Sequence, residues 1–194
     1  MSEMIPYLPA EEMKKFYQYL DNSKIYFEFG SGGSTYQAFK RKNIQKIYTV
    51  ESDARWINKL YENGIPRKND KLIIFYVDTK VGENKFSFPG KTSTYTDWIK
   101  YSRAFGNMDS SIKKEVDFIL IDGRFRVACA LNLFSEISDS TIVAYDDFYN
   151  RDYYHIVLDY FDVIESVGRM AFFKKKNVNP PSVELIFKYE NDVR

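Results

Sequence analysis

The sequence contains a single cysteine, Cys129, among 194 residues. One cysteine excludes an intramolecular disulfide and any zinc site built from several cysteines, and it fits a reducing compartment. No apolar run approaches the ~20 residues of a membrane span, and the polar segment 1–9 has no signal-peptide hydrophobic core. We therefore expect a cytoplasmic protein without a membrane partner.

The sequence also lacks an excess of charge of either sign. Lys and Arg number 28 against 27 Asp and Glu, which gives a net charge of +1. The basic runs 40–42 and 174–176 are local, and we interpret each as the solvated end of a helix or strand. Because no basic stripe is present, nucleic acid is not expected as a partner.

The sequence has enough apolar residues to form the hydrophobic core of one domain. Hydrophobic residues make up 44% of the sequence and aromatic residues 18%, which excludes intrinsic disorder. Domains usually contain about 100–200 residues. We predict a single domain over residues 1–194.

Short β-rich segments alternate with segments of helical periodicity. The N-terminal segment 1–23 holds the first helix, over 9–20, where apolar residues recur at helical spacing. The β-rich segments are 24–29, 46–52, 71–78, 116–123 and 141–147, and the helical ones between and after them are 34–42, 53–64, 126–137 and 153–161. This alternation predicts an α/β, Rossmann-like fold with a mostly parallel sheet and helices on both faces.

Three segments depart from this rhythm. Residues 79–110 form a long, aromatic insertion beside the carboxyl edge of the sheet, which predicts a lid that contributes to an acceptor site. Segments 162–168 and 169–176 predict an antiparallel hairpin at the end of the sheet. The tail 182–190 alternates like a strand, yet the Pro-Pro-Ser sequence at 180–182 is also typical of a helix start, and both alternatives stay open.

The first β-rich segment runs into a glycine loop. Gly30, Gly32 and Gly33 let the backbone turn sharply and approach a ligand closely. Thr35 stands where the dinucleotide fingerprint G-x-G-x-x-G has Gly or Ala, so that match is partial. Glu28 shares a strand face with Gly30, and its carboxylate would repel a pyrophosphate and favour an amine or sulfonium cation. The loop therefore predicts a cationic ligand.

Acids also end the next two β-rich segments. Glu51 follows the loop by about twenty residues, where an acid bonds both ribose hydroxyls in dinucleotide-binding folds. Asp78 ends the third segment, at the edge from which it can reach an adenine amino group. One such acid is ordinarily a turn or cap residue, but a line of acids beside a glycine loop favours ligand binding.

In this order the motifs resemble those of the class I S-adenosylmethionine (SAM)-dependent methyltransferases. EFGSGG is similar to their first motif, VES to their acid-ended second motif, YVD to their adenine-contacting acid, and VDFILIDG to their fourth strand. The resemblance covers residues 24–175 and implies a seven-stranded sheet whose seventh strand is reversed. It implies SAM as cofactor, bound by Glu28, Gly30, Ser31, Gly32, Glu51, Ser52, Asp78 and Asp122.

Asp122 follows the fourth β-rich segment, and Asp146 and Asp147 end the fifth. Three carboxylates at neighbouring strand ends are a plausible Mg²⁺ site. The arrangement is similar to the macrocin-type sugar O-methyltransferases, although Arg-Phe-Arg at 124–126 stands where those enzymes have an acid and an aromatic. The alternative is that Asp122 bonds the cofactor's amino group, Asp146 forms a turn and Asp147 pairs with an arginine.

His155 is the only histidine. An imidazole with its ordinary pKa near 6.5 can take the proton of an acceptor hydroxyl, and Asp147 is the other candidate base. A lone histidine on a tyrosine-rich helix can equally be a packed, hydrogen-bonded residue. Arg124, Arg126 and Arg151 could hold an anionic acceptor bidentately or neutralise the neighbouring acids.

The expected function is SAM-dependent methyl transfer, with oxygen of a small molecule or sugar as acceptor. One alternative is a nicotinamide-dependent oxidoreductase, which the glycine loop and Glu51 would allow but which Glu28 disfavours. A Rossmann domain that binds a cofactor without turnover is the second alternative. No Asn-Pro-Pro-Tyr motif follows the fourth β-rich segment, which disfavours methylation of nucleic acid or protein. Whether the chain forms a homo-oligomer stays open.

Overall fold

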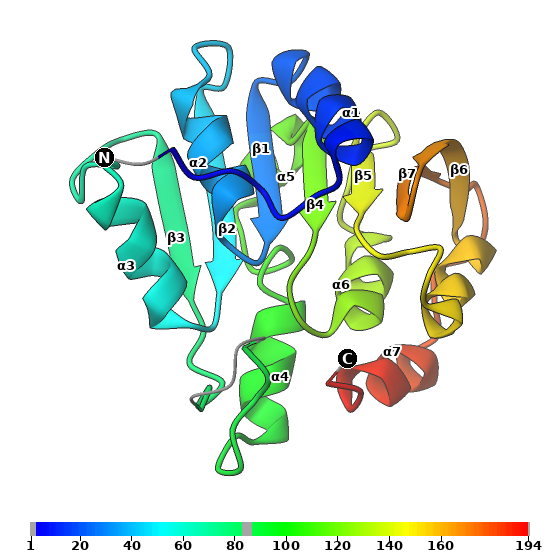
Figure 1. Ribbon diagram of the computed structural model, residues 1–194. Helices are drawn as coiled ribbons and strands as arrows, with labels where there is room; N and C mark the ends of the chain where they lie inside the picture. The colour runs from blue at the N-terminus through cyan, green and yellow to red at the C-terminus, as the bar shows by residue number, and fades with distance from the viewer. Residues whose placement is uncertain (1–2, 83–86, 194) are drawn as a thin grey trace.

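Seven strands form one sheet in the order β3-β2-β1-β4-β5-β7-β6, with helices on both sides of it (Figure 1). The computed structural model describes residues 3–82 and 87–193. Strands β1 to β5 run parallel, whereas β7 lies antiparallel between β5 and β6. This confirms the predicted α/β class, with a mostly parallel sheet that ends in an antiparallel hairpin.

The elements follow the predicted alternation. The strands are β1 (Ile25–Phe29), β2 (Lys46–Glu51), β3 (Leu72–Tyr76), β4 (Phe118–Ile121), β5 (Ile142–Tyr145), β6 (Phe161–Val167) and β7 (Met170–Lys175). The helices are α1 (Ala10–Asp21), α2 (Gly33–Lys40), α3 (Ala54–Glu62), α4 (Tyr95–Ser102), α5 (Ser110–Glu115), α6 (Arg126–Leu133), α7 (Val183–Glu190) and the 3-10 helix η1 (Asp152–Asp159). None of the helices in the described part of the chain has the length and apolar character needed to cross a bilayer.

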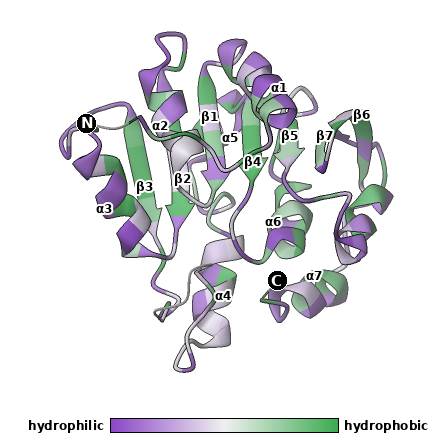
Figure 2. Ribbon diagram, viewed as in Figure 1, coloured by the Kyte–Doolittle hydropathy of each residue, from purple (hydrophilic) through white to green (hydrophobic). Residues whose placement is uncertain are grey.

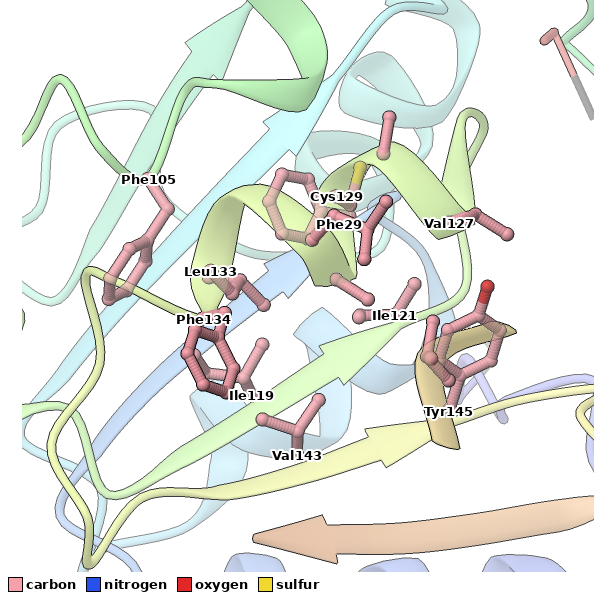
Figure 3. Packing of buried hydrophobic residues seen from close by; sticks show 14 of the residues in the cluster. Phe29, Phe105, Ile119, Ile121, Val127, Cys129, Leu133, Phe134, Val143 and Tyr145 are labelled. Atoms are coloured by element: carbon pink, nitrogen blue, oxygen red, sulfur yellow. The ribbon is translucent and has the colours of Figure 1, made fainter. Parts of the chain in front are cut away.

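Consecutive residues of the central strand β4 pack into opposite layers. Phe118 and Leu120 belong to a cluster with residues of α1, α2 and α3. Ile119 and Ile121 belong to a second cluster with residues of α4 and α6, part of which Figure 3 shows. A continuously apolar strand such as β4, which is green in Figure 2, is typical of a parallel sheet that helices cover on both faces.

The tail, for which both a strand and a helix were open, is the helix α7. Ser182 Oγ accepts a hydrogen bond from the backbone N of Leu185 at 3.2 Å, which caps the first turn. Leu185, Ile186 and Tyr189 then pack against the larger core cluster. The helical spacing of these three residues lets them pack on one face, and the segment is therefore a helix in spite of its strand-like alternation.

Two other segments take a form that the sequence pattern did not specify. The segment predicted as a helix over 153–161 is the 3-10 helix η1, whose N-cap Arg151 makes no side-chain capping bond. The insertion 79–110 is partly regular, since it contains α4. Within the insertion, residues 83–86 lie outside the described part of the chain.

Residues 3–9 lead into α1 and pass in front of α2 and β1 (Figure 1). The side-chain amide of Gln37 donates to the carbonyl oxygen of Met4 at 2.9 Å. A Cβ at Gly33 would lie 2.3 Å from the carbonyl carbon and oxygen of Ile5. The missing side chain at Gly33 therefore lets this N-terminal segment pack onto the start of α2.

Candidate functional site

A cavity of about 520 Å³ opens at the carboxyl ends of β1, β4 and β5. Strands β1 and β4 are neighbours in the sheet although β2 and β3 separate them in sequence. Open α/β sheets bind ligands at such a switch in strand order. The volume also falls in the roughly 300–1,000 Å³ range of ligand pockets.

The cavity gathers most of the site residues that the sequence predicted. Those in its lining are Gly30, Ser31, Gly32, Glu51, Ser52, Asp122, Asp146 and Asp147. Three predicted residues, Glu28, Asp78 and His155, do not line it. Other walls come from the N-terminal segment, the starts of α2, α3 and α6, the insertion with α4, the loops after β4 and β5, and the β6–β7 turn.

The glycine loop combines two packing glycines with one that faces open space. Gly30 has φ +94°, and a Cβ there would lie 2.9 Å from the Cα of Gly123, so the loops after β1 and β4 touch. Gly33 makes room for the N-terminal segment. A Cβ at Gly32 would meet only the ring of Trp56, at 3.8 Å. Gly32 is therefore the glycine at which a ligand can approach the backbone.

Glu51 is held by four hydrogen bonds at the end of β2. One carboxylate oxygen accepts from the backbone N of Ser31 at 2.7 Å and from its hydroxyl at 3.0 Å. The other oxygen accepts from the backbone N of Ser52 and of Asp53, each at 2.7 Å. Burial raises the pKa of Glu51, and this effect outweighs the lowering by the hydrogen bonds. Glu51 therefore ties the glycine loop to the end of β2, and its carboxylate lies in the cavity lining.

Glu28 lies beneath the glycine loop and is fully buried. Its carboxylate accepts hydrogen bonds from the hydroxyls of Tyr26 at 2.9 Å, Ser34 at 2.6 Å and Thr35. The Thr35 hydroxyl in turn accepts from the backbone N of Gly32 at 2.8 Å. Burial raises the pKa of Glu28 to about 7. The hydroxyls at the start of α2 therefore draw this acid away from the cavity where we expected it.

Asp78 lies in a neighbouring depression of about 370 Å³. Its carboxylate accepts from the backbone N of Lys80 at 2.8 Å and from the Lys80 ammonium at 2.7 Å. Ser52 lines both the depression and the main cavity. The two hollows are therefore neighbours on either side of the β2–α3 loop.

The three predicted metal ligands are engaged by arginines. Arg126 is buried and places one guanidinium nitrogen 2.8 Å from Asp122 and another 3.6 Å from Asp146. Asp147 pairs with Arg151 and, at 2.7 Å, with Arg169. In the described ranges no three acidic, histidine or cysteine side chains are arranged to hold a metal ion. The structure does not support the predicted Mg²⁺ site at Asp122, Asp146 and Asp147, because guanidinium groups pair closely with Asp122 and Asp147 and one also lies 3.6 Å from Asp146.

Asp146 differs from its two neighbours. Its Oδ1 is buried and has no hydrogen-bond partner among the described residues. Burial and the nearby charge of Asp122 raise the pKa of Asp146 to about 7. A carboxyl group with such a pKa in a cavity wall can take or give a proton at neutral pH.

His155 lies outside the cavity lining, on η1. Its Nε2 is 3.1 Å from the carbonyl oxygen of Phe148, and its ring packs against the Phe148 ring with centroids 4.9 Å apart. A carbonyl oxygen only accepts, so Nε2 carries the hydrogen in this bond. Nε2 is therefore not free to act as a base, which fits the packed interpretation of this residue.

No family model and no curated protein matches the chain. Among solved structures, a methyltransferase-like protein from Silicibacter pomeroyi matches 97% of each chain at 24% identity, with a TM-score of 0.81. An RNA methyltransferase from Salinibacter ruber in complex with S-adenosyl-L-homocysteine (SAH) has a TM-score of 0.52 at 14% identity, covering 91% of this chain and 97% of that one. Human methyltransferase-like protein 13 in complex with SAH has a TM-score of 0.51 at 12% identity, covering 90% and 82%. The fold is that of the class I methyltransferases.

These identities establish the methyltransferase fold and not an acceptor. None of the three structures is described as a sugar O-methyltransferase, so they do not show the macrocin-type similarity. One acts on RNA by its description, so the fold alone does not separate nucleic-acid acceptors from small molecules.

Several residues of this cavity were not named from the sequence, although two of them, Tyr101 and Ser87, lie in the insertion 79–110 that was expected to contribute to an acceptor site. Tyr101 of α4 forms one wall, and a Cβ at Gly123 would lie 2.0 Å from its hydroxyl. Ser87 comes from the insertion, and Trp56 comes from the first turn of α3. No local motif marks these positions, although the tryptophan shortly after Glu51 was a usable hint.

Proposed function

We propose that this chain is a SAM-dependent methyltransferase that methylates an oxygen of a small molecule or sugar. The observation that carries the proposal is the cavity at the β1/β4 switch, where the open face of Gly32, the acid Glu51 and a set of ionisable residues after β4 and β5 come together. This is the ligand edge of a methyltransferase fold.

The residues present fit the cofactor. The backbone at Gly32 and the carboxylate of Asp122, whose side chain is 38% exposed, suit its amino-acid part. Glu51 suits the ribose. The depression that holds Asp78 suits the adenine. When bound, SAM supplies a methyl group on a positively charged sulfur.

The chain itself has to orient the acceptor, exclude water and remove one proton. The acceptor oxygen forms a bond to the methyl carbon as the carbon–sulfur bond breaks, and the hydroxyl proton passes to a base. Of the bases expected from sequence, Asp147 lines the cavity but is paired with two arginines, and His155 lies outside. Asp146 lines the cavity and has a pKa raised to about 7, which makes it the better proton acceptor.

Calorimetry with SAM, SAH and NAD tests this proposal. We expect SAM and SAH to bind and NAD to bind much more weakly. Gly32→Val should fold, since the backbone there is extended and the added atoms face open space, yet it should weaken SAH by roughly tenfold or more through a steric clash. Gly106→Ala, away from the cavity, is the control. NAD binding without SAH binding would favour the oxidoreductase, and SAH binding without turnover on any acceptor would favour the non-catalytic domain.

A further inference from the structure

Four arginines line the end of the cavity between the loops after β4 and β5 and the β6–β7 turn. Arg126, Arg151 and Arg169 each pair with one or more of the carboxylates described above, and Arg169 also contacts Glu12 of α1 at 3.5 Å. Arg124 lines the same cavity, but no carboxylate in the described ranges lies within ion-pair distance of its guanidinium. Among the residues that the structure describes, Arg124 therefore has no carboxylate partner.

The guanidinium of Arg124 is held in place by an aromatic ring. It lies over the ring of Phe88, from the insertion, at 4.4 Å from the centroid. When the face of a guanidinium group contacts an aromatic ring, its in-plane N–H donors stay available for a planar or tetrahedral anion. No hydrogen bond from this side chain to another described residue is present.

The described surroundings of Arg124 carry positive charge that no neighbouring carboxylate offsets directly. Burial and the positive charge of Arg126 lower the pKa of Arg124, and Arg151 adds to the effect. The carboxylates that face this end are Asp122, Asp146 and Asp147, and each is nearer to another arginine. A bound anion would supply the missing counter-charge.

We propose that this end of the cavity binds a carboxylate or phosphate group of the methyl acceptor, with Arg124 as the guanidinium that holds it. The inference rests on the proposed function only in assigning the anion to the acceptor. It narrows that acceptor to a small molecule that carries both a nucleophilic hydroxyl and an anionic group.

The test is calorimetric titration of the SAH-saturated full chain with phenyl phosphate, benzoate and benzyl alcohol. The two anions should bind, and the neutral alcohol should bind at least about tenfold more weakly. Arg124→Met should reduce the affinity for both anions by roughly 10- to 100-fold, and Arg124→Lys should restore part of it. Arg67→Met, at an exposed position outside the cavity, makes the same charge change and should bind like wild type.

Three results would overturn the proposal. The first is no binding of either anion, and the second is equal affinity of benzoate and benzyl alcohol. The third is an unchanged affinity for phenyl phosphate in Arg124→Met, with the fold of that variant verified by near-UV circular dichroism.

A second arm separates the acceptor from the cofactor, because the amino-acid part of SAH also carries a carboxylate. Methylthioadenosine lacks that group. If Arg124→Met weakens SAH but not methylthioadenosine, Arg124 holds the cofactor and the acceptor assignment is wrong. We expect both ligands to bind this variant as they bind wild type.

Repeating the anion titrations without SAH distinguishes this inference from the proposed function. If wild type binds neither SAH nor methylthioadenosine, the methyltransferase proposal fails. Loss of phenyl phosphate binding in Arg124→Met would still support the anion site in that case.

Discussion

One carboxylate oxygen of Glu51 accepts both the backbone N–H and the hydroxyl of Ser31, at 2.7 and 3.0 Å. Glu51 ends β2, whereas Ser31 belongs to the loop after β1. The pair therefore ties the glycine loop to the neighbouring strand. This acid therefore shapes the loop in the absence of any ligand.

We expect Glu51→Gln to destabilise the chain by about 1–3 kcal/mol and to weaken SAH binding. Glutamine replaces one carboxylate oxygen with an amide that donates, so buried donors of Ser31 or Ser52 lose their acceptor. Denaturant unfolding and calorimetry measure both effects. Glu62→Gln, on the exposed side of α3, is the matched control. An unaltered unfolding free energy together with unaltered SAH affinity would contradict this role.

Stability should fall as the pH rises from about 4.5 to about 7, in part because of Glu28. Its pKa is raised from 4.5 to about 7 in the folded chain, so in this window the folded state holds a proton that the unfolded state has lost. The stabilisation is complete below pH 4.5 and disappears as Glu28 ionises. Asp146, with a pKa raised to about 7, acts in the same direction.

The measurement is the free energy of unfolding at several pH values for wild type, Glu28→Gln and Asp146→Asn. Each variant should show a shallower decline than wild type, because one of the two buried acids is gone. Glu62→Gln should follow the wild-type curve. Curves of equal slope for wild type and both variants would refute the raised pKa values.

Mg²⁺ should leave the melting temperature of wild type unchanged. Asp122 and Asp147 are neutralised by Arg126, Arg151 and Arg169, and a divalent cation would have to displace these guanidinium groups. Thermal melts with millimolar MgCl₂ and with EDTA test the expectation against NaCl of equal ionic strength. A Mg²⁺-dependent rise that Asp122→Asn abolishes would restore the metal site.

If Asp146 takes the acceptor proton, methyl transfer should rise as the pH passes through about 7, where this carboxyl group ionises. Asp146→Asn should lower kcat by roughly 10²- to 10⁴-fold. His155→Gln should stay within a few-fold of wild type, since His155 lies outside the cavity and bonds to the Phe148 carbonyl. SAH release with an active acceptor gives the rates. A large loss in His155→Gln with a normal rate in Asp146→Asn would reverse these roles.

The succession of strands and helices along the chain and the cluster of loop residues at one sheet edge could be predicted because each depends on local signals. Alternating β-rich and helical segments give the parallel sheet, and glycines or acids at strand ends meet at one edge of it. The hydrogen-bond partners of these acids could not be predicted in the same way. The Glu28 side chain lies beneath the loop because it accepts hydrogen bonds from the hydroxyls of Tyr26, Ser34 and Thr35. This arrangement depends on how the side chains pack.

The structure does not support the metal prediction, for a related reason. Carboxylates close together suggest a cation, but the sequence does not tell which cation. Here the cations are guanidinium groups, and Arg169 reaches Asp147 from the β6–β7 turn, 22 positions along the chain. A distant partner of this kind leaves no mark on the local pattern.

The N-terminal segment sets where the functional unit begins. The sequence motifs and the sheet start at about residue 24, and a truncated chain cut there would keep every strand. It would lose the wall formed by Ile5, Pro6, Tyr7 and Leu8, and it would also lose Glu12, which accepts from the backbone N of Arg169 at 2.7 Å. A minimal domain drawn around the strands would thus have a more open cavity, and Arg169 would keep its pair with Asp147 but lose Glu12. Domain boundaries for expression or for grafting therefore belong before residue 3.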